Sequence, residues 1–265
     1  MKNYFFEITK TLPSFFNLIL NMRTVFKLII FLLFSCLGAF AQSNTVSYSG
    51  YPIDGNIKKD SAINAFLASY RDSVSKTMND VIGFSVSGMS KHQPESGLGN
   101  FMTDALKIVG EKKFQQKIDA AFVNFGGVRS YIPKGNITVG SIFEIMPFDN
   151  MLILQKVRGD SLISFLNHIA EKNGWPLSGV TMGIKEKKAV NVMLGDKPIS
   201  VDSIYTIANS DYIANGGDNT NMLKVFPKIN KGILIRDVLI EYVKMLTEKG
   251  NSIDFKTEKR IEYVN

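Results

Sequence analysis

Two short polar motifs between residues 124 and 150 contain the residues best suited to ligand chemistry. The first, NFGGVR at residues 124–129, follows an apolar run over residues 120–123 that is typical of a buried strand. Glycines beside a strand end let backbone amides approach a ligand, and Arg129 offers a fork of donors to a phosphate or a carboxylate. An anion-binding turn and a plain β-turn with a solvated arginine both fit this motif, and short motifs of this kind are often plain turns.

Aromatic rings accompany the polar motifs. In PFDN, residues 147–150, Phe148 is flanked by proline, aspartate and asparagine, which suits a stacking surface better than a core position. A further motif, ANGGD at residues 214–218, follows a strand-like run, and Tyr212 lies between the two. Tyr212 is also compatible with a core position, and the glycine pair is compatible with a simple turn.

The N-terminal region has the pattern of a secretory signal. The chain has 265 residues, of which 45% are hydrophobic and 21% charged, enough for one large domain or two small ones. From Met22, the basic residues Arg23 and Lys27 precede an uncharged apolar run over residues 28–41 that ends in an A-x-A cleavage motif. We therefore expect residues 1–41 to be a signal-peptide region with Met22 as the true start. The apolar run is too short to span a bilayer.

Cleavage after Ala41 predicts a secreted or periplasmic protein. The single cysteine, Cys36, lies in a weak lipoprotein-like sequence, but the bulky Phe34 and the downstream A-x-A motif favour simple cleavage. The mature chain would then have no disulfide, no thiolate nucleophile and no thiolate metal site. Its small basic excess contains no Lys/Arg block, so we do not expect a nucleic-acid partner.

Residues 42–60 are polar and turn-rich and predict a loose leader, which leaves residues 61–265 for a folded domain. Helical and strand-like patterns mix there without a strict βαβ rhythm, so we predict a single α+β domain. Asp160 is the expected N-cap of the third helix. The expected helices are 61–78, 98–109, 161–171 and 233–246, and the expected strands are 81–86, 120–123, 152–157, 189–194, 203–208 and 260–264.

Several familiar catalytic patterns are missing from the sequence. The two histidines are His92, in an expected loop, and His168, which we expect to be a partly buried structural residue on a helix. No H-E-x-x-H or H-x-H motif, G-x-S-x-G elbow or Walker sequence is present, and no clustered ligand set for a metal can be assembled. The letters GDSL at residues 159–162 spell an esterase motif, but no Asp-x-x-His follows to supply a base. We predict no catalytic and no metal-binding residues.

Taken together, the motifs resemble one family. They are ESGLGNFMTDA at residues 95–105, NFGGVR with PFDN, and ANGGD. In order and spacing they are similar to those of the C-terminal domain of 5'-nucleotidases, the family of ecto-5'-nucleotidase and the periplasmic UDP-sugar hydrolases. The resemblance covers about residues 80–247. It implies a mixed α+β domain that binds the nucleoside, whereas a separate N-terminal metallophosphatase domain of the family holds two metal ions and performs hydrolysis.

The resemblance also implies roles for individual residues. Phe148 matches a ring that stacks on the base, and Tyr212 lies where the family usually has a second phenylalanine. Asp218 matches an acceptor for the ribose hydroxyls, and Arg129 matches an arginine that faces phosphate. The implied substrate-binding residues are Asn124, Gly126, Gly127, Arg129, Phe148, Asn150, Tyr212 and Asp218.

One segment departs from the family pattern. Residues 91–94 read KHQP, where the family often has a further substrate arginine. The resemblance therefore leaves the phosphate affinity and the substrate range of this chain open. Glu95 and Asn100, in the first family motif, are equally suited to capping and bracing the helix that begins near Leu98.

We therefore expect a nucleotide-binding subunit of a split 5'-nucleotidase with a role in nucleotide catabolism. It would present a nucleoside or nucleotide to a separately encoded metallophosphatase, which would carry the two divalent metals, and it would hold no cofactor of its own. Hydrolysis by this chain alone is not expected, although its family is one of hydrolases. Two alternatives remain: a stand-alone nucleoside-binding protein and a module that makes only protein contacts.

Overall fold

The computed structural model describes residues 21–32, 46–52, 54–55, 57–58 and 60–264. The chain divides into two units, Met1–Lys59 and Asp60–Asn265. In the first unit, residues 21–32 form an exposed helix. The expected cleavage motif at Ala41 and the lone Cys36 lie outside the described residues. Within the part that is described, no helix is both long enough and apolar enough to cross a membrane.

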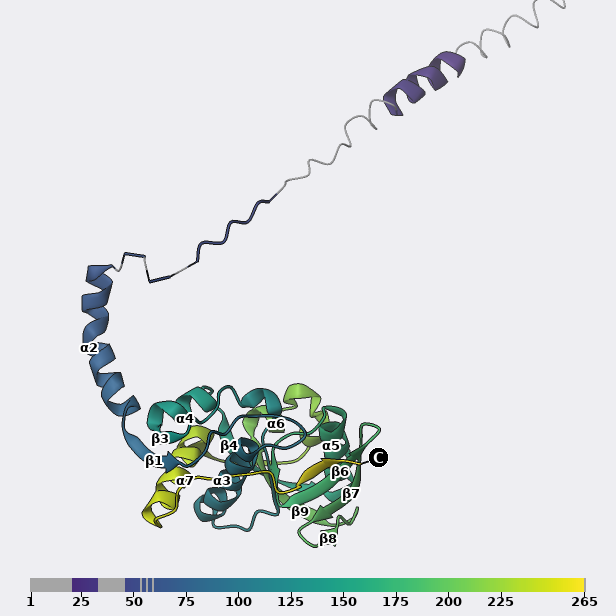
Figure 1. Cartoon of the computed structure of the whole chain (residues 1–265). Helices are drawn as coiled ribbons and strands as arrows, with labels where there is room; N and C mark the ends of the chain where they lie inside the picture. The colour runs from purple at the N-terminus through teal and green to yellow at the C-terminus, as the bar shows by residue number, and fades with distance from the viewer. Residues whose placement is uncertain (1–20, 33–45, 53, 56, 59, 265) are drawn as a thin grey trace, which may run out of the picture. The chain divides into compact units, whose positions relative to one another are not determined.

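The second unit opens with helix α2, Ser61–Met78, which has the expected bounds (Figure 1). Asp60 caps it by accepting hydrogen bonds from the backbone amides of Ala62 and Ile63 at 2.9 and 3.0 Å. Met78, at the end of the helix, packs against the core. The apolar stripe of α2, by contrast, is exposed to solvent; it consists of Ile63, Phe66, Leu67, Tyr70 and Val74.

A five-stranded sheet forms the centre of the second unit, in the order β10-β4-β9-β2-β5. Its strands are β10 Lys228–Leu234, β4 Met151–Arg158, β9 Ile204–Ser210, β2 Ala120–Phe122 and β5 Leu177–Ser178. β2 and β9 run parallel, whereas the other neighbours run antiparallel. Side chains alternate between the two faces: Ala120 and Phe122 enter one buried cluster, and Ala121 and Val123 enter the other.

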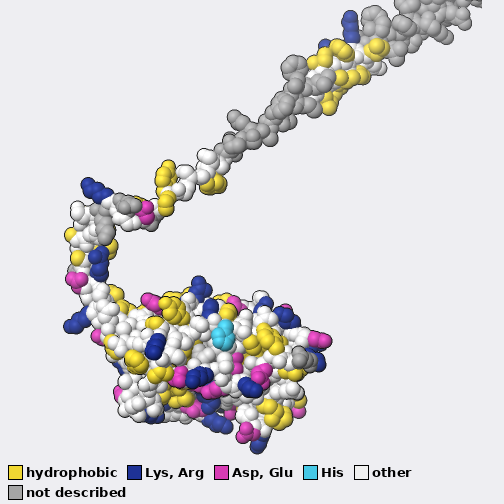
Figure 2. Space-filling model, viewed as in Figure 1, with side chains coloured by type: hydrophobic (Ala, Val, Ile, Leu, Met, Phe, Trp, Pro, Cys, Tyr) yellow, Lys and Arg dark blue, Asp and Glu magenta, His cyan; other side chains and the backbone are white. Residues whose placement is uncertain are grey.

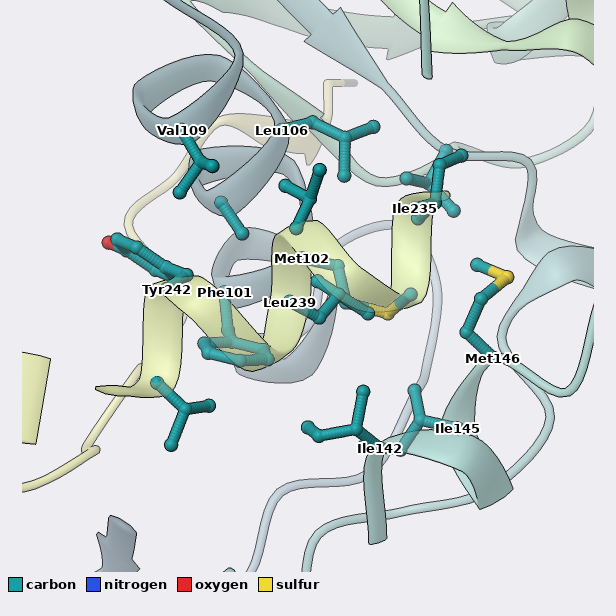
Figure 3. Close-up of a cluster of buried hydrophobic side chains, with 14 of the residues drawn as sticks. Phe101, Met102, Leu106, Val109, Ile142, Ile145, Met146, Ile235, Leu239 and Tyr242 are labelled. Carbon is teal, nitrogen blue, oxygen red and sulfur yellow. The ribbon is translucent and has the colours of Figure 1, made fainter. Parts of the chain in front are cut away.

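Helices on one face of this sheet form the first hydrophobic cluster (Figure 3). They are α3 Gly97–Phe114, α4 Val139–Ile145 and α7 Ile235–Glu248. Apolar residues recur along α3 at helical spacing, so that one face of the helix lies against α7. The members of this face are Leu98, Phe101, Met102, Ala105, Leu106 and Val109, all of which are fully buried.

Helix α5, Gly159–Glu171, and Trp175 belong to the second cluster, on the other face. A four-stranded sheet of order β11-β6-β7-β8 completes this side, and a two-stranded sheet pairs β1 with β3. The bounds are β11 Ile261–Tyr263, β6 Val180–Lys185, β7 Lys188–Leu194, β8 Lys197–Pro198, β1 Val81–Ser85 and β3 Gly135–Thr138. The mixture of helices with separate, mostly antiparallel sheets confirms the predicted α+β class.

Three details of the sequence prediction are wrong. The helix expected over residues 98–109 continues to Phe114 as α3. Asp160 is not the N-cap of α5, because the helix already begins at Gly159; its carboxylate instead accepts hydrogen bonds from Ser161 and Arg158. The last helix begins at Ile235 rather than residue 233, because the preceding residues extend β10, whose Leu234 pairs with Met151 of β4.

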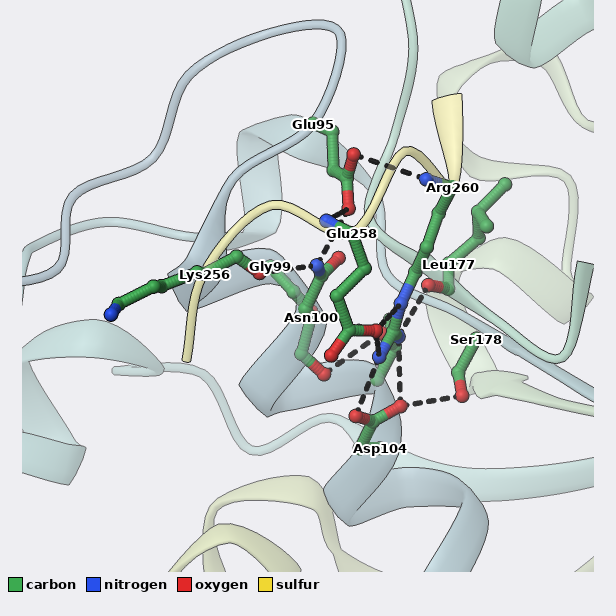
Figure 4. Close-up of polar contacts among 10 residues, drawn as sticks. Glu95, Gly99, Asn100, Asp104, Leu177, Ser178, Lys256, Glu258 and Arg260 are labelled. Carbon is green, nitrogen blue, oxygen red and sulfur yellow. Dashed lines mark hydrogen bonds and ion pairs between the residues drawn. The ribbon is translucent and has the colours of Figure 1, made fainter. Parts of the chain in front are cut away.

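The C-terminal segment is attached to α3 by a buried polar network (Figure 4). Glu95 accepts hydrogen bonds from the Asn100 side chain at 2.7 Å and from the backbone amides of Glu258 and Arg260 at 2.8 and 3.1 Å. The Asp104 carboxylate accepts hydrogen bonds from both terminal nitrogens of Arg260 at 2.8 and 2.7 Å. The ESGLGN motif therefore has a structural role: its polar side chains hold residues 256–260 against α3.

Removal of Arg260 should leave the largely buried carboxylate of Asp104 without its ion-pair partner. The side chains of Arg260 and Asp104 are only 11% and 15% exposed, so Arg260→Met should lower the free energy of unfolding by about 3 kcal/mol in urea denaturation. Lys259→Met is the matched control, because the Lys259 side chain is 80% exposed and its ion pair with Glu262 should contribute less than about 1 kcal/mol. Equal stabilities of the two variants would contradict the assigned role of the network.

Candidate nucleotide site

Parallel pairing of β2 and β9 brings two turns to the same edge of the central sheet. Ala120 pairs with Ile207 and Ala121 with Ala208, so both strands end side by side. The 3₁₀ turn η1, Phe125–Gly127, follows β2. The short helix α6, Asp211–Ala214, and the 3₁₀ turn η2, Gly217–Asn219, follow β9. In open parallel α/β sheets ligands bind beyond the carboxyl ends of the strands, and the two turns occupy the corresponding position at the parallel β2–β9 pair.

Hydrogen bonds join the two turns directly. The side-chain amide of Asn124 donates to one carboxylate oxygen of Asp218 at 2.7 Å, and Asn124 is only 7% exposed. The hydroxyl of Tyr212 donates to the other oxygen of Asp218 at 2.8 Å and accepts from its backbone amide at 3.2 Å. The hydrogen bond to Asp218, together with burial, raises the pKa of the Tyr212 phenol. Asn124, Tyr212 and Asp218 therefore form one connected polar group.

Glycine is required at two positions around this group. A β-carbon at Gly127 would lie 2.6 Å from the side-chain oxygen of Asn124, and one at Gly217 would lie 2.4 Å from the ring of Tyr212. A larger residue at either position would displace the side chain that contacts it. The glycines of NFGGVR and ANGGD thus make room for Asn124 and Tyr212.

A second group follows η1 in the chain. The guanidinium carbon of Arg129 is 5.6 Å from the centre of the Phe148 ring, and Arg129 donates to the carbonyl of Gly126 at 3.3 Å. Phe148 and Tyr212 are 39% and 44% exposed, so both rings present surface to solvent. Among the ring pairs of the described residues, these two do not contact one another.

The remaining residue implied by the resemblance, Asn150, is half-buried beside β4. Its carbonyl accepts the backbone amide of Ile235 at 2.9 Å, which fixes its position between β4 and α7. Its neighbour Asp149 pairs with Arg236 at 2.5 Å. Contacts with α7 therefore fix the backbone of the PFDN segment, from which the Phe148 ring extends.

Sequence reasoning missed two side chains that hold these turns. The ammonium of Lys91 donates to the carbonyls of Val128 and Phe125 at 2.6 and 3.3 Å and lies 4.6 Å from the centre of the Phe125 ring. His168 is partly buried, and its Nε2 also lies 2.9 Å from the carbonyl oxygen of Asp218. Both residues come from segments outside the glycine motifs, so no local pattern indicated the contacts.

A hollow of about 350 Å³ adjoins the two turns. It is lined by Gln93, Phe125, Gly126, Lys172, Trp175, Asp218 and Asn219. Larger hollows of about 540 and 660 Å³ lie elsewhere, along α3 and α7 and beside β8, and contain none of the implied substrate-binding residues. Among the residues that the structure describes, no group of three or more His, Cys, Asp and Glu side chains is placed to hold a metal ion.

Basic and acidic side chains are interspersed on the face of the second unit that Figure 2 shows. No single basic block dominates that face. The candidate site is defined by the local groups around η1 and η2.

Comparison with known proteins places these motifs in one family. Residues 73–225 match the family described as "5'-nucleotidase, C-terminal domain". A 5'-nucleotidase of Vibrio vulnificus is 29% identical over 210 residues, which cover 76% of this chain and 37% of the relative. A trifunctional nucleotide phosphoesterase of Bacillus subtilis is 26% identical over 245 residues, which cover 84% of this chain and 16% of the relative.

A solved structure agrees with the sequence comparisons. The structure of a 5'-nucleotidase precursor from Thermus thermophilus superposes with a TM-score of 0.68 and 25% sequence identity, covering 76% of this chain and 43% of that chain. This chain therefore spans less than half the length of these relatives. Because the family match covers residues 73–225, more than half of the chain, the protein belongs to the family of 5'-nucleotidase C-terminal domains.

Proposed function

We propose that this chain binds a nucleoside or nucleotide at the edge formed by η1 and η2 and presents it to a separately encoded metallophosphatase. The observation that carries the proposal is the hydrogen-bonded group of Asn124, Tyr212 and Asp218, in which the ring of Tyr212 is exposed to solvent. The partner would carry two divalent metals and hydrolyse the phosphate ester. The chain described here would bind and orient the substrate, with no cofactor of its own.

Asp218 has the remaining capacity to bind ribose. An ionised carboxylate can accept about four hydrogen bonds, and the contacts from Asn124 and Tyr212 use two of them. The free positions suit a pair of neighbouring hydroxyls. Because Asn124 and Tyr212 fix the carboxylate on both oxygens, little freedom would be lost on binding.

The rings and the arginine supply the other parts of the site. Phe148 and Tyr212 would stack on the base, an interaction of about 1–3 kcal/mol per ring–base contact. Arg129 is exposed and uses one of its five donors on Gly126, so the others are available to a phosphate. Asn124, Gly126, Gly127 and Asn150 would complete the polar surround.

The division of labour follows from what the chain contains. The chain spans less than half the length of its relatives, and the described residues include no metal-ligand cluster, so we assign the metal chemistry to the partner. The basic, apolar and A-x-A sequence before residue 42 supports export to the periplasm or the exterior, where extracellular nucleotides would be degraded.

The exposed stripe of α2 favours a second candidate function. Five large apolar side chains on one helix face exceed the scattered exposure that is normal for a protein surface. This feature is expected of a module whose role is protein contact. Failure of a well-folded chain to bind any nucleoside would favour this candidate over the first.

Ring stacking by Tyr212 can be tested by calorimetric titration of residues 42–265 with adenosine, AMP and UDP-glucose. Tyr212→Ala should weaken binding of the preferred ligand by about 1–3 kcal/mol, because it removes the stacking surface. Tyr212→Phe keeps the ring and removes only the hydroxyl that contacts Asp218, so its loss should be smaller. Equal losses for both variants would refute stacking as the role of the ring.

The phosphate contact is tested by the difference between two ligands. Arg129→Met should weaken the binding of AMP by about 1.5–3 kcal/mol, the range for hydrogen bonds to charged groups, and should leave the binding of adenosine nearly unchanged. Lys156→Met, at an exposed position of β4, is a charge-matched control and should change neither affinity. An equal loss for adenosine and AMP would assign Arg129 to structure rather than to phosphate.

The split arrangement predicts activity only in the assembled state. The tagged chain, purified from its native host, should recover a metallophosphatase, and the complex should hydrolyse AMP in a manner that a metal chelator abolishes. The isolated chain provides the control and should be inactive. Repeated purification that recovers no metallophosphatase, with no gain of hydrolysis on mixing, would reject the split enzyme and leave the titrations to decide whether the chain binds nucleosides.

A further inference from the structure

The Asp218 turn has an unusual backbone. Asp218 has a φ of 51° and the next residue, Asn219, has a φ of 67°, so two successive non-glycine residues lie in the left-handed region. Aspartate and asparagine tolerate this region better than most residues, but it is still disfavoured. Such a conformation persists only where surrounding contacts determine it.

Contacts hold every polar group of Asp218. The carboxylate accepts from Asn124 and Tyr212, and the backbone amide donates to the Tyr212 hydroxyl. The remaining group, the backbone carbonyl, lies 2.9 Å from Nε2 of His168. His168 is therefore the contact that fixes the peptide between Asp218 and Asn219.

His168 is itself held by the core. Its side chain is 10% exposed, and its ring meets the buried Trp175 edge to face at 5.6 Å between ring centres and 89° between planes. Its neighbour on α5, Ile169, is fully buried in the second cluster. The position of the imidazole is thus set by the core of the domain rather than by a loop.

A carbonyl oxygen can only accept a hydrogen bond, so Nε2 of His168 must carry the proton. In the neutral ring this leaves Nδ1 without a proton, facing Glu171 with 3.9 Å between Nδ1 and the carboxylate. The contact therefore excludes a ring that is protonated only at Nδ1, and the position of the proton is an observable property of the protein.

We propose that His168 is a positioning residue for ribose recognition. Its Nε2–H fixes the turn from which Asp218 extends and thereby directs the carboxylate toward the ribose hydroxyls. The inference rests on the proposed nucleoside-binding function. It assigns a role in the site to a helix α5 residue that lies 50 positions from Asp218 in the sequence.

Two ligands distinguish a role of His168 in directing Asp218 from a general disruption of the site. Adenosine carries both ribose hydroxyls, whereas 2',3'-dideoxyadenosine carries neither, so only adenosine should depend on the direction of Asp218. His168→Leu should lower the affinity for adenosine roughly three- to tenfold, as expected for the loss of one hydrogen bond, and should leave the affinity for the dideoxy ligand unchanged. His168→Gln, whose amide nitrogen can replace Nε2, should restore most of the adenosine affinity. An unchanged adenosine affinity in His168→Leu, or equal losses for both ligands, would overturn the proposal.

Measurements on the ligand-free protein test the His168 contact independently of nucleoside binding. The backbone amide of Asp218 should exchange with solvent severalfold faster in His168→Leu and return toward the original rate in His168→Gln. In the unaltered protein, nitrogen NMR of its two histidines should show His168 as the Nε2–H tautomer, with His92→Gln used for assignment. Unchanged exchange or an Nδ1–H tautomer would overturn the positioning contact, whereas absence of adenosine binding with these signatures intact would refute only the nucleoside-binding function.

Discussion

The hydrogen bond between Asn124 and Asp218 is the constraint on which the candidate site depends. It spans 94 positions of the sequence at 2.7 Å, and it forms because β2 and β9 run parallel and end at the same edge of the sheet. Tyr212 and His168 then complete the contacts of Asp218. If β2 paired in a different register, the Asn124 and Asp218 turns would separate and no shared polar group could form.

Much of the chain serves to hold that edge in place. The first cluster supports one face of the central sheet through α3 and α7, and the second supports the other through α5 and Trp175. The network around Glu95 and Asp104 fastens the C-terminal segment to α3 without contacting the site residues. Family motifs therefore divide into two kinds: ESGLGN stabilises the fold, whereas NFGGVR and ANGGD shape the turns of the candidate site.

The long helices and the α+β class could be predicted from the sequence, because apolar periodicity reports directly on helices such as α3 and α7. Shorter elements such as α4 and strands such as β6 and β10 were not predicted. The sheet order could not, since it depends on pairing between residues such as Ala121 and Ala208 that are far apart in the chain. The capping role of Asp160 was wrong because a strand-to-helix turn had already started the helix at Gly159. Lys91 and His168 escaped prediction because each acts through backbone carbonyls of a distant turn, and carbonyls leave no sequence signature.

A crystal structure of residues 42–265 with adenosine would test the central claim most directly. The account predicts that the ribose hydroxyls contact Asp218, that the base lies against Phe148 and Tyr212, and that the bond from Asn124 to Asp218 persists. Adenosine bound in the hollow beside β8, with the Asn124, Tyr212 and Asp218 group untouched, would contradict it.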